Sequence, residues 1–451
     1  MLYPTASGTP PGQAFDVRGD ITLKNLFITG YYELVDSNLN NLQGSLMNTG
    51  AAGANITIDS CVLSNTNGNH LRTDQAPKNV KITNTTFANM GFLGRSNLGA
   101  GKGIDVRAGS VDTLIIQNCT FVNWLDRVVR HYNSTAAIKY FKFDHNTLVN
   151  GGSFHGILSL GKVGYKSIIT NNLLYDAFGF GNDTDATRQA EFTDSQEKDP
   201  FGKARMTWIM SAPNDTTVWT VSNNYYAVSD SQQGFYTRWA SAGVTGEGSP
   251  LTWHINAKIG ADSTNAFKKV SLRFSKIPKG MFNLMDWYRS PSGGNKTKNT
   301  PTTAWVRALH DFDRKGFQYV RDTLNGSFYA SMNLSAASTD GKVIGDTRWS
   351  YLGSTGVGQD GAVPAVYSLE QNYPNPFNPS TVITYRIPVT GMVSLKVYNL
   401  IGQEVATLVN GVQTASSYEV PFDASKLSSG IYFYTLRSGD FVQTRKMMLL
   451  K

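Results

Sequence analysis

Three short runs in the first third of the chain each end in an arginine. They are His70-Leu-Arg72, Asp105-Val-Arg107 and Val128-Val-Arg130. A guanidinium group binds a carboxylate through two parallel hydrogen bonds, so a row of arginines suits a polymer that carries carboxylates. A lyase acting on such a polymer also needs a side chain that removes a proton and a group that protonates the leaving oxygen. The chemistry that these residues suggest is recognition of an acidic polysaccharide.

Side chains two residues apart in a strand lie on the same face, so we predict that His70 lies with Arg72 and Asp105 with Arg107. The predicted site is a ladder of three arginines with polar residues beside it. Its candidate substrate-binding residues are His70, Arg72, Asp105, Arg107, Arg130 and His131, with His155 and Lys162 one coil further on.

Three guanidinium groups this close repel one another unless an anion or a carboxylate neutralises them. Asp74, Asp105 and Asp126 are the carboxylates that pair with the arginines if the face is only structural. Three interpretations therefore stay open: a structural charged face, a glycan-binding face without catalysis, and the active site of a lyase or hydrolase.

The elements that position these arginines come from a repeat. Seven segments place two apolar residues five positions apart, with polar residues between them: Leu23 and Ile28, Ile58 and Leu63, Ile82 and Phe87, Ile116 and Phe121, Phe143 and Leu148, Ile169 and Leu174, Val221 and Tyr226. Successive first members are separated by 35, 24, 34, 27, 26 and 52 residues. A short basic period with insertions of variable length is typical of a right-handed parallel β-helix, in which each coil is one turn of short strands.

Counted from the second apolar residue of its coil, the arginine recurs at a regular position. Arg72 and Arg130 follow Leu63 and Phe121 by nine residues, whereas Arg107 follows Phe87 by twenty, because the glycine-rich insertion 91–103 intervenes. The three arginines are therefore expected on successive coils, about 4.8 Å apart.

Asparagine and cysteine also recur in the repeat. Asn residues just before the second apolar residue, such as Asn118 and Asn146, are expected to stack and hydrogen-bond at a coil corner. Cys61 and Cys119 hold equivalent positions, with Thr85 in the coil between. This places them about 10 Å apart, beyond the roughly 7 Å that a disulfide spans. Both are predicted to be free, buried thiols.

Domain boundaries follow the loss of the repeat. Residues 1–232 are predicted to form the β-helix, and residues 233–352 its C-terminal coils, an insertion and a cap over its open end. The glycine-rich residues 353–365 are predicted to be a linker. Residues 366–451 show short alternating runs separated by Gly, Pro and Asn, which predict a small immunoglobulin-like β-sandwich. The predicted fold class is all-β.

The last 86 residues carry three characteristic segments. They are Tyr367-Ser-Leu-Glu-Gln-Asn-Tyr-Pro-Asn-Pro-Phe-Asn-Pro, Val393-Ser-Leu-Lys-Val-Tyr-Asn-Leu-Ile-Gly-Gln-Glu-Val, and Gly430-Ile-Tyr-Phe-Tyr-Thr-Leu followed by Lys446-Met-Met-Leu-Leu-Lys451. This region closely resembles the type A C-terminal sorting domain of the type IX secretion system. The resemblance implies that the secretion machinery is a partner, and that the protein crosses the periplasm and outer membrane to be secreted or displayed at the cell surface. Such a route begins with a signal peptide, which the printed chain lacks, so we expect the chain to be truncated.

The β-helix itself resembles the pectate-lyase-like proteins. The segments that carry this resemblance are Asn118-Cys-Thr-Phe, Arg127-Val-Val-Arg-His131 and Asp340-Gly-Lys-Val-Ile-Gly-Asp-Thr-Arg-Trp349. No spacing matches a catalytic signature of pectate lyases, so no catalytic residue is assigned.

Composition narrows the function further. The formal net charge is +8, but no run of Lys and Arg suggests a nucleic-acid partner. No apolar run is long enough to span a membrane as a helix. No cofactor is expected: Asp183-Thr-Asp185 and Asp311-Phe-Asp313 suit Ca²⁺, but neither lies in a twelve-residue loop with a terminal Glu. The function that follows is an exported β-helix that engages an extracellular acidic polysaccharide, as a lyase or as a binding protein; the alternative is a non-catalytic adhesin or structural protein.

Overall fold

The computed structural model describes residues 12–30, 44–66, 68–91, 99–131, 136–182, 216–244, 259, 266–278, 280–289, 324–354, 367–372, 375–413 and 416–450. It divides into two compact units, Met1–Ser354 and Thr355–Lys451. The first unit is called the passenger below. Each unit has its own hydrophobic core.

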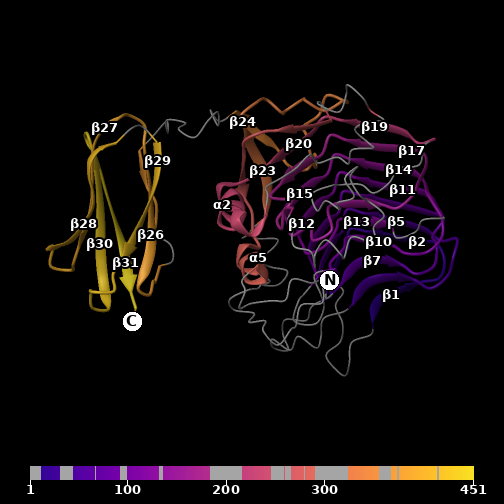
Figure 1. Cartoon of the computed structure of the whole chain (residues 1–451), viewed down its shortest axis with the longest axis horizontal. Helices are drawn as coiled ribbons and strands as arrows, with labels where there is room; N and C mark the ends of the chain where they lie inside the picture. Colours follow the sequence, from indigo (N-terminus) through magenta and orange to yellow (C-terminus); the bar gives the residue numbers. More distant parts are fainter. Residues whose placement is uncertain are drawn as a thin grey trace. The chain divides into compact units, whose positions relative to one another are not determined.

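The passenger is a parallel β-helix in which the chain visits three parallel sheets in turn (Figure 1). The first sheet contains β1 (Gln13–Val17), β4 (Ser45–Thr49), β7 (Asn69–Thr73), β10 (Ile104–Val106), β13 (Val129–His131) and β16 (Leu158–Leu160). The second contains β2 (Ile21–Lys24), β5 (Asn55–Asp59), β8 (Asn79–Thr83), β11 (Val111–Gln117), β14 (Ile138–Asp144), β17 (Val163–Thr170) and β19 (Val218–Ser222). The third contains β3 (Phe27–Thr29), β6 (Val62–Thr66), β9 (Thr86–Met90), β12 (Thr120–Trp124), β15 (Thr147–Gly151), β18 (Leu173–Tyr175), β20 (Asn224–Ala227) and β21 (Phe267–Lys269).

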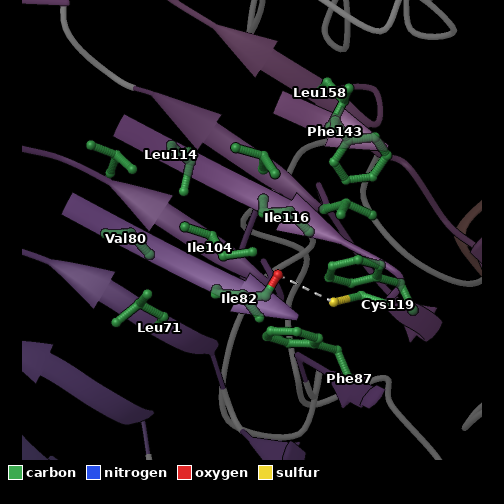
Figure 2. Close-up of a cluster of buried hydrophobic side chains, with 14 of the residues drawn as sticks. Leu71, Val80, Ile82, Phe87, Ile104, Leu114, Ile116, Cys119, Phe143 and Leu158 are labelled. Atoms are coloured by element: carbon green, nitrogen blue, oxygen red, sulfur yellow. Dashed lines mark hydrogen bonds between the residues drawn. The ribbon is translucent and has the colours of Figure 1, made fainter. Parts of the chain in front are cut away.

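The predicted repeat is confirmed by the pairing register. The first apolar members pair from coil to coil along the second sheet, as Ile58 with Ile82 and Ile82 with Ile116. The second members pair in the same way along the third sheet, as Phe87 with Phe121. These side chains are buried and fill the space between the sheets, where the rings of Phe87 and Phe121 stack with centroids 4.6 Å apart. Figure 2 shows this interior, with aliphatic side chains of the first and second sheets, such as Ile104 and Ile82, near Phe87 of the third.

Asparagine builds the corner between the second and third sheets. Asn84, Asn118, Asn171 and Asn223 all have a positive φ, between 53° and 60°, a left-handed conformation that Asn adopts more readily than most residues. The side-chain amide of Asn118 donates to Oδ1 of Asn84 over 2.6 Å, which ties adjacent coils together. The predicted stacking of Asn at a coil corner is therefore confirmed.

Both cysteines are free and buried, as predicted. The backbone N–H of Cys61 donates to Oγ1 of Thr85 over 3.3 Å, which shows that Thr85 holds the equivalent position in the next coil. Cys119 lies within 3.7 Å of the carbonyl oxygen of Ile82 (Figure 2). Burial raises the pKa of the Cys119 thiol to about 12, so both the position and the protonation state make it unreactive.

The segment after the repeat covers one side of the β-helix. A small sheet of β22 (Leu272–Lys276), β23 (Asn325–Ala330) and β24 (Tyr351–Ser354) packs its apolar residues on the outer face of the third sheet. Within the same predicted segment, β21 pairs with β20 as a further strand of the third sheet, whereas β22–β24 lie on the outer face of that sheet; the cap over the open end stays a prediction. The outer face of the third sheet carries Val122, Val149 and Leu173, and burying these apolar side chains is more favourable than leaving them in water.

A strap of residues 338–349 crosses the Asn corner over several coils. The backbone N–H of Gly345 donates to the carbonyl of Asn171 over 2.8 Å, and the buried carboxylate of Asp346 accepts from Oγ1 of Thr120 over 2.6 Å. Arg348 reaches one coil further, donating to the carbonyl of Asn84 over 2.7 Å. This explains the Asp340–Trp349 motif as a structural element that fastens the coils to one another.

Two helices cover the corner between the third and first sheets. They are α2 (Asp230–Arg238) and α5 (Phe282–Arg289), and they form a separate apolar cluster with Leu125, Phe154 and Phe180 from the coil loops. The ring of Phe154 meets Tyr288 of α5 edge to face, with centroids 5.8 Å apart. This corner is therefore closed by packed aromatic side chains.

The second unit is a β-sandwich of two antiparallel sheets, as predicted. One sheet contains β25 (Ser368–Leu369), β26 (Ser380–Ile387) and β29 (Ser416–Asp423), and the other β27 (Gly391–Tyr398), β28 (Glu404–Gln413), β30 (Gly430–Ser438) and β31 (Phe441–Leu449). Alternate residues of these strands, such as Ile383, Leu395 and Tyr434, fill a common core.

Candidate functional site on the first sheet

One column of side chains runs along the outer face of the first sheet. The pairing register brings together, in order, Asp16, Asn48, Arg72, Asp105, Arg130 and Ser159. Their strand neighbours Leu71, Ile104 and Val129 are fully buried in the interior, so by alternation the column faces outward. We call it the first-sheet column.

The predicted ladder was wrong at its middle rung, where Asp105 and not Arg107 lies between Arg72 and Arg130. The strand β10 ends at Val106, and Arg107 follows it at the corner, where its backbone N–H donates to the carbonyl of Thr73 over 3.1 Å. Register in a sheet is fixed by backbone hydrogen bonds, and residue counting across the 91–103 insertion does not reproduce it.

Asp105 neutralises the column. Its carboxylate is 1% exposed and accepts hydrogen bonds from Nε and Nη2 of Arg130 over 2.6 and 2.9 Å. Nδ2 of Asn69 donates to the same carboxylate over 3.0 Å. Arg130 is therefore held in a bidentate pair, the geometry that a substrate carboxylate would otherwise take.

The other two arginines share Asp74. Nε of Arg72 donates to it over 2.9 Å, and Nη1 of Arg107 lies 3.8 Å from it. Burial alone would raise the pKa of Asp74, but the hydrogen bonds from Arg72 and Asn48 outweigh burial and lower it. All three predicted arginines thus have a carboxylate partner, and Arg107, 39% exposed, has the longest contact.

The histidines predicted beside the arginines face the interior. His70 is fully buried, and its ring stacks on Phe87 with centroids 5.6 Å apart. It lies at the start of β7, where the chain leaves the corner and strict alternation does not yet hold. His131 is in register with the interior residues Val106 and Leu160. Burial lowers the pKa of His131 to about 4, so it is neutral at physiological pH.

A second charged cluster lies at the corner that precedes the first sheet. Nζ of Lys102 lies 2.7 Å from Oδ2 of Asp126 in an ion pair. Nδ1 of His155 lies 2.5 Å from Oδ1 of the same carboxylate, and Nη1 of Arg127 lies 3.7 Å from Oδ2. These side chains precede β10, β13 and β16 by two or three residues, a spacing that was present in the sequence and that we did not use. We call these four residues the corner cluster.

The side chains of the corner cluster are buried, with at most 8% of any one exposed. Burial lowers the pKa of Lys102 to about 8 and that of His155 to about 4. Burial would raise the pKa of Asp126, but Lys102, Arg127 and His155 together hold it well below its usual range. Asn69 joins the cluster to the first-sheet column, because its Oδ1 accepts from the backbone N–H of Lys102 over 3.2 Å.

Lys162 does not join either group. It follows β16, whereas His155 precedes the same strand, so the two lie at opposite ends of it. Its backbone N–H donates to Nδ1 of His131 over 3.4 Å. Among the described residues no three His, Cys, Asp or Glu side chains form a metal-binding group, and Asp183, Asp185, Asp311 and Asp313 lie outside those residues.

Residues 371–450 match the family described as the secretion system C-terminal sorting domain. The chain ends in a type IX secretion sorting domain. Neither the curated proteins nor the solved structures include a match to this chain. The sorting domain identifies an exported protein that is secreted or held at the outer-membrane surface, and it implies interaction with the type IX secretion machinery.

The sorting domain keeps apolar side chains in water as well as in its core. Leu400 and Ile401, in the turn between β27 and β28, are 70% and 78% exposed. Asn399 fixes this turn, since its Oδ1 accepts from the backbone N–H groups of Ile401 and Gln403 over 3.2 and 2.9 Å. Single exposed apolar residues are common on protein surfaces, so these two carry no functional assignment. Within the described helices of the whole chain, none is long and apolar enough to cross a membrane.

Proposed function

We propose that this protein is a non-catalytic surface adhesin: the sorting domain exports it, and the β-helix binds an extracellular polysaccharide without cleaving it. The observation that carries the proposal is the neutralisation of the first-sheet column. Asp105 and Asp74 already form ion pairs with its arginines and with Arg107. A substrate carboxylate at Arg130 would have to displace a bidentate partner that is itself buried.

The groups with a suitable pKa for proton transfer are in the wrong place for a lyase. Lys102, with a pKa of about 8, would be the natural base, but its side chain is only 3% exposed and is bound to Asp126. The side chains of His155 and His131 are buried, and both imidazoles are neutral. A base must lie within hydrogen-bond reach of the proton that it abstracts, and none of these three groups faces the outer surface of the first sheet.

The test combines binding and cleavage assays on the purified chain. Alginate, polygalacturonate, chondroitin sulfate and heparin are immobilised for a retention assay and incubated in solution with the protein for a cleavage assay. We expect retention on at least one polymer, with no rise in the ultraviolet absorbance of unsaturated uronate and no loss of viscosity. Product formation would overturn the non-catalytic assignment. Binding to none of the four polymers would overturn the assignment as an adhesin.

A further inference from the structure

In the described part of the passenger, the second sheet has an exposed outer face. The third sheet is covered by β22–β24, and the first is self-neutralised by its column of paired charges. The outer face of the second sheet instead leaves two large side chains in water, Tyr165 at 62% and Val218 at 60% exposure. We propose that this face is a binding platform for an anionic polysaccharide, with tyrosines stacking on sugar rings and lysines binding the anionic groups. The inference rests on the proposed function and names its ligand class and its site.

A β-bulge holds Tyr165 outward. Ile138 and Tyr140 of β14 pair with Val163 and Lys166 of β17, so β17 carries one extra residue between the two pairs. Bulges re-aim side chains and are enriched beside binding sites. Here the bulge brings the ring of Tyr165 beside that of Tyr140, with centroids 6.0 Å apart and planes at 42°.

Two residues, Gly164 and Thr217, allow the backbone to form this bulge. A Cβ atom at Gly164 would lie 2.6 Å from Cα and 2.9 Å from the carbonyl oxygen of Lys139, so only glycine fits. The buried Thr217 then satisfies the bulged backbone, because its Oγ1 lies 2.9 and 2.6 Å from the carbonyl oxygens of Val163 and Gly164. Gly164 and Thr217 thus support the backbone that holds an exposed aromatic ring outward. This arrangement favours a ligand that stacks on the ring.

The charge of the face gives the class of ligand. Three lysines are paired: Lys24 with Asp59, Lys139 with Asp112 and Lys142 with Asp144, over 3.5, 2.6 and 3.1 Å. Lys81 and Lys166 form no ion pair within the part of the chain that the structure describes. Lys166 is paired across the strands with Tyr140, so a cation without an ion pair to any described residue lies directly beside the aromatic pair.

The arrangement of these groups matches a polymer. Lys81, Ile115 and Lys142 occupy one outward column on successive strands, and Thr113, Tyr140 and Lys166 occupy the next. Neighbouring strands are about 4.8 Å apart, comparable with the length of one sugar residue. A chain laid across the strands would meet Lys81 and Lys142 in one column and Tyr140 and Lys166 in the other.

The experiment measures retention of the purified full-length protein on polygalacturonate, which carries carboxylates, and on dextran sulfate, which carries sulfates. Neutral dextran and single-stranded DNA serve as comparison ligands. We expect binding to at least one anionic glycan, weakened as salt rises, because exposed charges are screened within about 10 Å at 0.1 M. Tyr165→Ala and Lys166→Gln should each weaken it about tenfold, the scale of one charge-assisted or stacking contact, without lowering the melting temperature. Arg107→Ala removes an exposed cation at the corner that follows β10; it is the matched control and should leave binding unchanged.

Each alternative outcome is decisive. If the wild type binds but Tyr165→Ala and Lys166→Gln bind equally well, the second-sheet platform is wrong while the adhesin stands. Loss of binding in Arg107→Ala alone would move the site to the first sheet. Equal affinity for single-stranded DNA, or binding to neutral dextran, would overturn the anionic-glycan assignment. A wild type that binds none of the glycans here or in the adhesin test would overturn both proposals.

Discussion

Asp105 neutralises positive charge at the centre of the first-sheet column. It lies between Arg72 and Arg130 in the register, is 1% exposed, and accepts two hydrogen bonds from Arg130. The guanidinium groups of Arg72 and Arg130, on the strands either side of β10, would repel each other without it. The column is therefore stabilised by alternating charge. Its arginines are engaged in ion pairs within the fold, and a ligand would have to displace those pairs.

This assignment predicts unequal costs for two substitutions. Asp105→Asn should lower the free energy of unfolding by about 2–3 kcal/mol, because it leaves Arg130 without its carboxylate in a largely buried position. Arg107→Ala should change it by less than about 0.5 kcal/mol, since the contact with Asp74 is long and exposed. Chemical denaturation of both variants measures the two values. Equal stabilities would mean that Asp105 is not the structural centre of the column.

Sequence reasoning at this scale succeeded where spacing was regular. Arg72 and Arg130 were placed correctly on the outer face, because each follows the apolar residue of its coil by nine positions. Arg107 was misplaced because the 91–103 insertion changes the count, and His70 because a corner interrupts the alternation of strand faces. Of the corner cluster only His155 was predicted as a site residue, because its members lie in loops before the first-sheet strands, where no alternation of apolar residues marks their position.

The elements of the passenger are determined mainly by the repeat and its corners. All seven apolar pairs fall in register in two sheets, because a one-residue slip would turn the whole set toward water. Residues 324–354 had no such pattern, and their packing on the third sheet depends on long-range contacts that no local signal reports. The strap within them depends on single residues, chiefly Gly345 and Asp346.

Two glycines test the role of the strap. Gly345 has φ +82°, and a Cβ atom there would lie 2.5 Å from Oγ1 of Thr147. Gly341 has φ +75° but no atom within 4 Å of such a Cβ. Gly345→Ala should therefore cost about 2–4 kcal/mol, a backbone penalty plus a clash, whereas Gly341→Ala should cost only about 1 kcal/mol.

Hydrogen exchange locates the effect of these glycine substitutions. In Gly345→Ala we expect faster exchange of the backbone amides in 324–354 while the second sheet stays protected. Identical exchange in the two variants would show that the strap does not fasten the coils.

At the scale of the whole molecule, the passenger and the sorting domain have separate hydrophobic cores, which allows ligand binding and export to reside in different units. The apolar clusters of the passenger draw on residues up to Tyr351, and that of the sorting domain begins at Tyr367. A unit with its own core is expected to fold alone. Fold and export were readable from sequence here, because both depend on contiguous motifs, whereas the ligand depends on side chains gathered from distant coils.

The last prediction separates delivery from folding. A chain lacking residues 366–451 should keep the stability of the passenger within about 0.5 kcal/mol, because no core residue of the passenger is removed. In cells that secrete the full-length protein, the truncated chain should stay in the periplasm. Leu395→Asp is the matched control: it places a charge in the core of the sorting domain at full chain length, and it should be retained in the same way. Surface fractionation measures delivery, and thermal unfolding followed by circular dichroism measures the fold. Loss of the folded passenger when residues 366–451 are removed, or arrival of the truncated chain at the surface, would contradict the prediction. The C-terminal unit would then not be an independently folded export signal.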